Sequence, residues 1–117
     1  MKYKYRLDEI TFKSGKKHLI LIVDQKIQLV STFLMSDIQG ANPDYVFDAL
    51  DKVLSGKSEY EELNGNVCGV EIHKDKTQIY DNLAEDGMGN WCEIETTELR
   101  ELVEIWCRKL KQFKEKK

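Results

Sequence analysis

The sequence predicts an α+β domain: a mostly antiparallel sheet with a mid-chain helix and a C-terminal amphipathic helix packed on it. Several short segments of alternating or β-branched residues are separated by turn-length stretches, which is typical of hairpins. Two longer segments instead repeat apolar residues every three or four positions, which is typical of helices. Because the strands outnumber the helices and most connections are short, the sheet should be mainly antiparallel.

The N-terminal part of the chain predicts a β-hairpin. Aromatic or apolar residues alternate with basic ones over residues 3–7, the pattern of a half-buried strand. The apolar phase then shifts to Ile10 and Phe12, so we expect a bulge at residues 8–9. A turn at residues 13–17 follows, where a glycine is available for positive φ.

The next two apolar segments predict further strands. Residues 19–23, "LILIV", are apolar at every position, so we expect a central strand that is covered on both faces. After a turn at residues 24–26, residues 27–35, "IQLVSTFLM", are rich in β-branched and apolar side chains. This composition favours a third strand and leaves a helix as the alternative.

A helix in the middle of the chain has clear boundaries. Asn42 is a suitable N-cap, Pro43 suits the first helical position, and Gly56 is a suitable stop. Ser58 and Glu61 then have the spacing of a capping box, which predicts a short helical turn. The apolar stripe of the predicted helix consists of Val46, Phe47, Leu50, Val53 and Leu54.

The C-terminal half predicts a hairpin, a short strand and a long helix. Residues 66–83 have the pattern of a hairpin, and residues 91–95 that of a final strand. A helix from about Thr97 follows, and we expect the basic tail beyond about Phe113 to fray. The apolar stripe of this helix consists of Leu99, Leu102, Val103, Trp106, Leu110 and Phe113.

Bulk properties predict a single cytoplasmic domain. A chain of 117 residues can form one hydrophobic core but not two, so we expect one domain over residues 1–117. No apolar run approaches the roughly 18–20 residues of a membrane helix, and residues 1–10 lack the apolar core of a secretory signal. The 3 cysteines, an odd number, favour reduced thiols over a disulfide framework. We therefore expect no membrane partner.

The net charge of −3 hides a strong asymmetry along the chain. Residues 37–101 contain sixteen acids and five bases, a charge of −11, whereas the remainder contains five acids and thirteen bases, a charge of +8. If folding gathers the acids on one surface, that surface will attract basic partners and repel nucleic acids.

The chain contains no signature of metal-binding or catalytic chemistry. Residues 81–95, "DNLAEDGMGNWCEIE", lack the alternating oxygen ligands of an EF-hand loop, and no CxxC pair occurs that could start a zinc site. No phosphate-binding motif is present, so we expect no cofactor. Cys68 or Cys92 could pair with His73 as nucleophile and base, but the neighbouring glutamates disfavour a thiolate. We expect a protein that is not an enzyme.

Protein binding is the function that the acids and aromatics favour. Acidic side chains steer a basic partner, and exposed aromatic side chains anchor the buried centre of an interface. Trp91 follows the glycine-containing stretch "EDGMGN", which favours its exposure on a partner-binding loop. The residues that we expect to contact the partner are Asp81, Glu85, Asp86, Trp91, Glu93, Glu59, Tyr60, Glu61 and Glu62.

The alternative is a small nucleic-acid-binding or regulatory protein that uses the basic N-terminal hairpin. Residues 2–17 combine six lysine and arginine side chains with Tyr3 and Tyr5, and cations with aromatics are typical of nucleic-acid surfaces. The acidic middle of the chain would repel a polyanion unless it lay on the opposite side. Protein is therefore the favoured partner.

The C-terminal quarter of the chain supplies a family resemblance. An acidic α+β chain of this size that ends in "EIETTELRELVEIWCRKLKQF" resembles the small immunity proteins of bacterial contact-dependent growth inhibition and related polymorphic toxin systems. The resemblance implies a protein that neutralises a cognate toxin, frequently a basic nuclease, by covering its active site or substrate surface. By that analogy the acids would stand in for nucleic-acid phosphates. The resemblance assigns no individual site residue.

Overall fold

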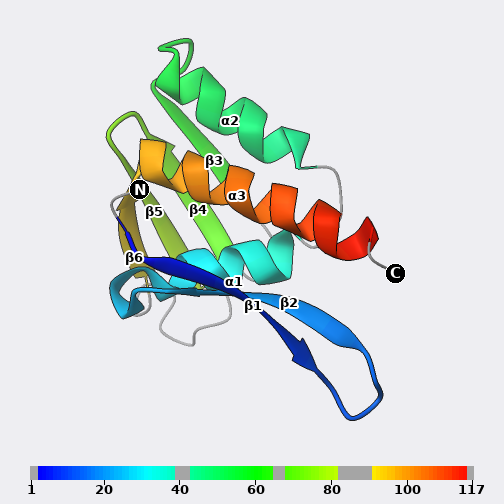
Figure 1. The fold of residues 1–117 in the computed structure, drawn as a ribbon. Coiled ribbons are helices and arrows are strands. Elements are labelled where there is room, and N and C mark those ends of the chain that lie inside the picture. Colours follow the sequence, from blue (N-terminus) through cyan, green and yellow to red (C-terminus); the bar gives the residue numbers. More distant parts are fainter. Residues whose placement is uncertain (1–2, 39–42, 65–67, 82–90, 116–117) are drawn as a thin grey trace.

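The structure, a computed structural model, describes residues 3–38, 43–64, 68–81 and 91–115 (Figure 1). These residues form two antiparallel sheets and three α-helices, which confirms the predicted α+β class. In chain order the elements are β1 (Tyr5–Thr11), β2 (Lys17–Val23), a 3₁₀ turn (Gln25–Ile27), α1 (Gln28–Asp37), α2 (Asp44–Leu54), β3 (Tyr60–Asn64), β4 (Cys68–His73), β5 (Lys76–Asp81), β6 (Trp91–Glu95) and α3 (Thr96–Glu115).

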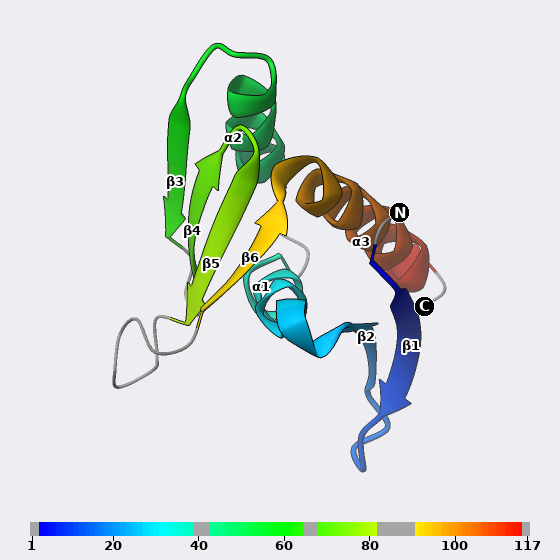
Figure 2. The same ribbon diagram turned by 90° about the vertical axis from the view of Figure 1, so that its left-hand side faces the viewer.

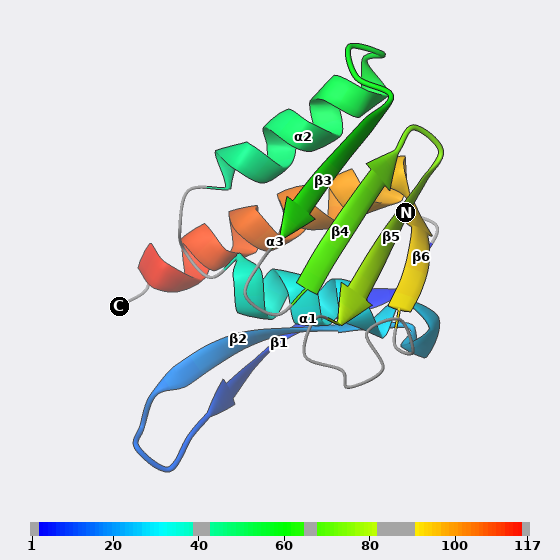
Figure 3. The same cartoon turned by 180° about the vertical axis from the view of Figure 1, so that it is seen from behind.

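A four-stranded antiparallel sheet in the order β3-β4-β5-β6 forms one layer of the molecule. All three helices pack against the same face of this sheet (Figure 2). Seen from behind, the sheet lies in front of the helices, and no described helix or strand covers its other face (Figure 3). The sheet therefore has an inner face toward the helices and an outer face, which we call the open face.

Alternation along the strands produces the core. Val70, Ile72, Ile79 and Ile94 occupy the inner face and are at most 1% exposed, because side chains two positions apart share a face. The helices contribute the apolar side chains that cover them, and those with at most 1% exposure are Val30, Phe33, Leu34, Val46, Leu50, Val53, Leu99, Leu102 and Val103.

Trp106, in the middle of α3, contacts the C-terminal end of α1. Its indole is 2% exposed, and Nε1–H donates a 2.7 Å hydrogen bond to the carbonyl oxygen of Ile38. Ile38 is the C-cap of α1, where carbonyl groups lack partners within the helix. The Trp106 side chain therefore fills core volume and also supplies a hydrogen-bond donor for a carbonyl group at the end of α1.

A pair of buried threonines positions the start of α3. The hydroxyls of Thr77 on β5 and Thr96 lie 2.8 Å apart, and the Thr96 hydroxyl also donates to the carbonyl oxygen of His73. The backbone N–H of Thr96 donates to the carbonyl oxygen of Asp75 at 3.1 Å. The first residue of α3 is thus attached to the β4–β5 turn.

The boundaries of α2 follow the predicted signals. Pro43, predicted at the first helical position, is instead the N-cap, so the helix begins one residue later at Asp44. Gly56 follows the end of the helix with a φ of 85°, a left-handed conformation that favours glycine. The Gly56 N–H donates to the carbonyl oxygen of Val53 at 3.2 Å. Asn42, the expected N-cap, lies outside the described residues.

The predicted strand at residues 27–35 is wrong, because α1 spans Gln28–Asp37. Leu29, Val30, Phe33 and Leu34 recur with the period of one helix face and are all buried. Burial of this face against the sheet and β2 outweighs the β propensity of the segment, which is a weak and context-dependent preference.

Two expectations for the N-terminal hairpin are also wrong. The β1–β2 register runs without interruption from Tyr5 opposite Val23 to Thr11 opposite Lys17, so no bulge occurs at residues 8–9. Within the described chain β2 pairs with β1 alone, and Ile22 is 40% exposed, so β2 is not a central strand covered on both faces. The shifted apolar residues simply lie on the outer face of the hairpin.

The capping-box residues Ser58 and Glu61 do interact, but at the start of a strand. The Ser58 hydroxyl donates to the carbonyl oxygen of Tyr60 at 2.8 Å and lies 3.4 Å from a Glu61 carboxylate oxygen. The predicted helical turn is therefore wrong, because β3 begins at Tyr60 and pairs with β4. A capping box by itself does not distinguish a helix start from another tight turn.

The C-terminal elements agree with the prediction. The hairpin of β4 and β5, the strand β6 and the long helix α3 all occur, and the first four residues of the predicted α3 stripe are buried. The helix continues to Glu115, past the point where fraying was expected, and residues 116–117 lie outside the described residues. None of the described helices has the length and apolar character needed to span a membrane.

We predict that Trp106→Phe lowers the free energy of unfolding by about 2 kcal/mol, because it removes a buried hydrogen bond and leaves a small cavity. Urea denaturation measures the change. Trp91→Phe is the matched control, since Trp91 is 49% exposed, and should stay within about 0.5 kcal/mol of wild type. Equal stabilities for the two variants would contradict the role assigned to Trp106.

Candidate functional site

Adjacent rows of side chains cross the strands on the open face, and the outermost row contains Tyr60, His73, Lys76 and Glu95. The two other rows carry most of the candidate site. Strand register places Glu62, Glu71, Gln78 and Glu93 side by side, one from each strand. The neighbouring row consists of Asn64, Gly69, Tyr80 and Trp91. Because neighbouring strands lie about 4.8 Å apart, each row extends roughly 14 Å across the sheet.

Tyrosine hydroxyls hold the carboxylates of Glu62 and Glu71 in place. Tyr60 Oη donates to Glu62 at 2.8 Å and lies 3.1 Å from Glu71, so it bridges two carboxylates on neighbouring strands. Tyr80 Oη donates to the other oxygen of Glu71. Directly opposed like charges destabilise a strand pair, and the shared phenol donor offsets part of this repulsion.

These contacts shift the pKa values of the groups involved. The hydrogen bond to Glu71 raises the pKa of Tyr80 to about 12, and the hydrogen bond to Glu62 raises the pKa of Tyr60. The pKa of Glu62 is lowered because Tyr60, and then Asn64, donate hydrogen bonds to its carboxylate. The phenols therefore stay protonated donors near neutral pH, and the Glu62 carboxylate stays ionised.

The acids of the open face differ from other acids in their partners. Within the described residues no lysine or arginine forms an ion pair with Glu62, Glu71 or Glu93. By contrast, Asp51 on α2 pairs with Arg100 at 2.6 Å. Lys76 lies on the open face and pairs with Glu95 at 2.9 Å. The open face therefore combines three carboxylates that form no ion pair with a described cation with two exposed aromatics, Tyr60 at 37% and Trp91 at 49%.

The structure brings four of the expected contact residues together on the open face: Tyr60, Glu62, Trp91 and Glu93. Glu61 and Asp81 belong to the inner side by alternation, opposite Ile72 and Cys68 respectively.

The other three expected contact residues are not in the strands of the open face as the structure describes them. Glu59 is exposed just before β3. Glu85 and Asp86 lie outside the described residues.

Glu71, Gln78 and Tyr80 complete the site but were not among the expected contact residues. Their strands were predicted, yet membership of the open face depends on strand order and register. The one signal available in the sequence was alternation: Glu71 separates buried Val70 and Ile72, and Gln78 separates buried Thr77 and Ile79.

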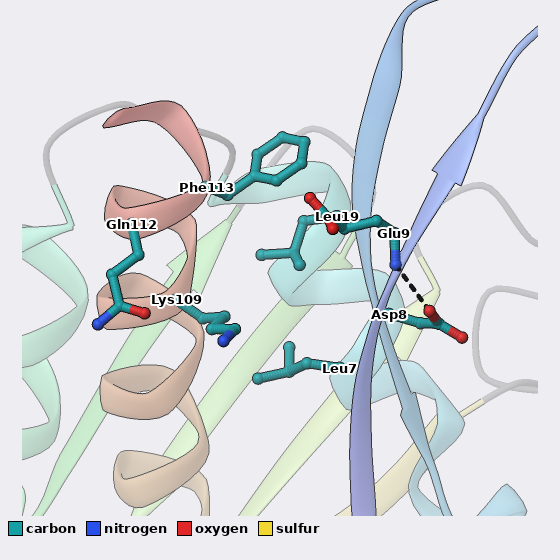
Figure 4. A pocket seen from close by; sticks show the side chains of 7 residues that line it. All are labelled: Leu7, Asp8, Glu9, Leu19, Lys109, Gln112 and Phe113. Carbon is teal, nitrogen blue, oxygen red and sulfur yellow. Dashed lines mark hydrogen bonds between the residues drawn. The ribbon is translucent and has the colours of Figure 1, made fainter. Parts of the chain in front are cut away.

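A groove of about 190 Å³ lies between the hairpin and the C-terminal half of α3. Figure 4 shows Leu7 and Leu19 of the hairpin facing the helix that carries Phe113. Lys109 and Gln112 border the groove from the helix side, and the Asp8 carboxylate accepts a hydrogen bond from the Glu9 N–H. This lining combines an apolar floor with scattered polar groups, without the arrangement of nucleophile, base and oxyanion donors that catalysis requires.

A second hollow of about 370 Å³ connects the edge of the sheet to α1. Asp81, Trp91 and Cys92 line it from the strands. Gln28 and Thr32 line it from α1. Asp81 therefore lies near Trp91 although the two residues belong to opposite faces of the sheet.

The candidate nucleophile pairs do not form. Cys68 and His73 occupy opposite ends and opposite faces of β4, roughly 16 Å apart along the strand. Cys92 is buried on the inner face, whereas His73 packs against Tyr60 on the open face with ring centroids 5.0 Å apart. Burial raises the pKa of Cys68 to about 12 and that of Cys92 to about 11. Among the described residues no three His, Cys, Asp or Glu side chains gather as metal ligands.

Comparison with known proteins identifies the family. No family profile matches the chain, and no solved structure matches it. The chain is 46% identical to an immunity protein of Bacillus cereus over 117 residues, which is 100% of this chain and 96% of that protein. Since the similarity covers nearly the whole length of both proteins, this chain belongs to the immunity-protein family represented by the Bacillus cereus protein.

Proposed function

We propose that this chain binds and neutralises a cognate bacterial toxin through the open face of its four-stranded sheet. The observation that carries the proposal is the row of Glu62, Glu71 and Glu93, which described cations leave unpaired, beside exposed Trp91 and Tyr60. Negative charge steers a basic partner during encounter, and aromatic side chains anchor the complex once water is excluded.

The chemistry of the face favours a basic toxin, and a nuclease is the class that we propose. A nuclease cleft attracts phosphates, and carboxylates spaced across a sheet can occupy the same cationic sites. Tyr60 and Tyr80 keep the carboxylates of Glu62 and Glu71 oriented before binding, which lowers the entropic cost of association. By covering the cleft or its substrate surface, the chain would block access of nucleic acid.

The biological setting is part of the same proposal. We propose that the protein acts in the cytoplasm, as the inhibitor of a toxin from a contact-dependent growth inhibition or related polymorphic toxin system. Glu85 and Asp86, which precede Trp91 in sequence, remain proposed contacts on the basis of charge.

Inhibition by binding requires no catalysis by this chain. We propose a non-enzymatic mechanism because the thiols that could act as nucleophiles are buried away from His73. A nucleophilic cysteine needs a stabilised thiolate, whereas burial here favours the neutral thiol.

We predict that Glu62→Gln with Glu93→Gln slows association with the cognate toxin domain by about tenfold at low salt. The salt dependence of the association rate should also decrease. Stopped-flow or surface-based kinetics with that purified domain measure both quantities. Asp48→Asn with Glu101→Gln, at exposed acids on α2 and α3, is the matched control and should associate nearly at the wild-type rate.

We predict that Trp91→Ala raises the dissociation rate of the complex by about thirtyfold, because a tryptophan anchor typically contributes at least ~2 kcal/mol. Tyr45→Ala is the control, since Tyr45 is 46% exposed and belongs to α2, which packs on β3 and β4 at the opposite edge of the sheet from β6. If the glutamate variant and Trp91→Ala both bind the toxin domain with wild-type kinetics, the open face is not the binding site.

We predict that Cys68 and Cys92 of the native protein react with a thiol reagent at least about a hundredfold more slowly than free cysteine at neutral pH. Both thiols should react at once after unfolding in urea. The measurement uses Cys107→Ala, because Cys107 is only partly buried. Rapid labelling of either native thiol would contradict the non-enzymatic proposal.

A further inference from the structure

The β1–β2 hairpin projects from the body of the molecule (Figure 1). Strand register places Ile10 and Ile22 on its outer face, where Arg6 and Asp8 form an exposed ion pair nearer the base of the hairpin. Its inner face packs Leu19 and Leu21 toward the helices. On the outer face, Ile10 is 37% and Ile22 40% exposed, and Phe12 at the tip is 49% exposed. A two-stranded hairpin is only marginally stable alone, so leaving large apolar side chains in water is a cost that a partner would relieve.

The tip of the hairpin combines these apolar side chains with positive charge. Phe12 packs on His18 with ring centroids 4.4 Å apart, and its N–H donates to the Lys16 carbonyl oxygen at 2.8 Å. Lys13, Lys16 and Lys17 are all exposed around it. No acid occurs between Ile10 and Val23, so this segment carries +3 while the rest of the chain carries −6.

We propose that the hairpin tip, residues 10–18, is a peripheral binding site for an anionic lipid bilayer. Phe12 and Ile10 would enter the interface between headgroups and acyl chains, and the three lysines would contact the anionic headgroups. Apolar burial combined with attraction to anionic lipids is the physical basis of reversible membrane binding. We expected no membrane partner because no segment spans a bilayer, but a peripheral contact requires no span.

Other occupants fit the tip less well. A nucleic acid would satisfy the lysines but leave Ile10 and Ile22 in water. A second copy of the chain would bring like charges together at the tip in a two-fold contact. A bilayer accommodates both the lysines and the apolar side chains.

The fold determines which side of a membrane-bound molecule would face away from the bilayer. The hairpin and the open face lie on opposite sides of the helical layer (Figure 2). An anionic membrane attracts the tip and repels Glu62, Glu71 and Glu93. A bound molecule would therefore present its open face away from the membrane. This proposal does not depend on the proposed toxin-binding function.

Vesicle co-sedimentation tests the proposal directly. The full chain should pellet with vesicles that contain phosphatidylglycerol and stay in solution with pure phosphatidylcholine vesicles, and high salt should weaken the binding. Phe12→Ser should weaken it about tenfold, because it removes the largest inserted side chain. Lys16→Gln with Lys17→Gln should weaken vesicle binding about thirtyfold, because it removes two side chains that are each attracted to the anionic surface.

Controls distinguish the tip from general charge effects. Lys52→Gln with Lys57→Gln removes the same charge at the far end of α2 and should bind vesicles like wild type. Urea denaturation should show that Phe12→Ser and the lysine variants remain as stable as wild type to within about 0.5 kcal/mol.

Three results would overturn the proposal. The first is equal binding, or no binding, to the two kinds of vesicle. The second is unchanged vesicle binding by Phe12→Ser, which would show adsorption by charge alone. The third is displacement of the protein from vesicles by a single-stranded oligonucleotide that binds Phe12→Ser and the wild type equally. That result would identify a nucleic-acid site.

Discussion

All three helices cover the same face of the four-stranded sheet, and the other features of this protein depend on this constraint. Alternation along the strands then assigns each residue either to the core or to the open face. Val70 and Ile72 pack under the helices, while Glu71 between them joins the carboxylate row. The same constraint places the indole of Trp106 against the end of α1, where its hydrogen bond unites core packing with helix termination.

The open face shows how a stable sheet can keep opposed carboxylates. Glu62 and Glu71 face each other across β3 and β4, an arrangement that destabilises a strand pair by itself. Tyr60 and Tyr80 offset this cost by donating hydrogen bonds, and their raised pKa values keep them protonated as donors. Stability thus comes from the inner face, while the open face retains charge and exposed aromatics that suit a partner.

Sequence patterns located most elements but not their environments. Pro43 and Gly56 were sufficient to predict α2, and the apolar stripe was sufficient to predict α3. Both signals are local in the sequence. The segment of α1 was predicted as a strand because its β-branched composition competes with its helical period, and only packing against the sheet and β2 decides between them. Likewise "LILIV" indicated a strand, but not that one of its faces would stay uncovered.

The sequence by itself determined the α+β class, the acidic middle with basic ends, the absence of a known catalytic motif, and Trp91, Tyr60, Glu62 and Glu93 as candidate contacts. The tertiary structure alone decided that these four share one face with Glu71 and Tyr80, and that Glu61 and Asp81 do not. It alone separated the cationic hairpin from that face. The reason is that periodicity is a property of neighbouring residues, whereas strand order, register and the side chosen by the helices depend on contacts between residues far apart in the chain.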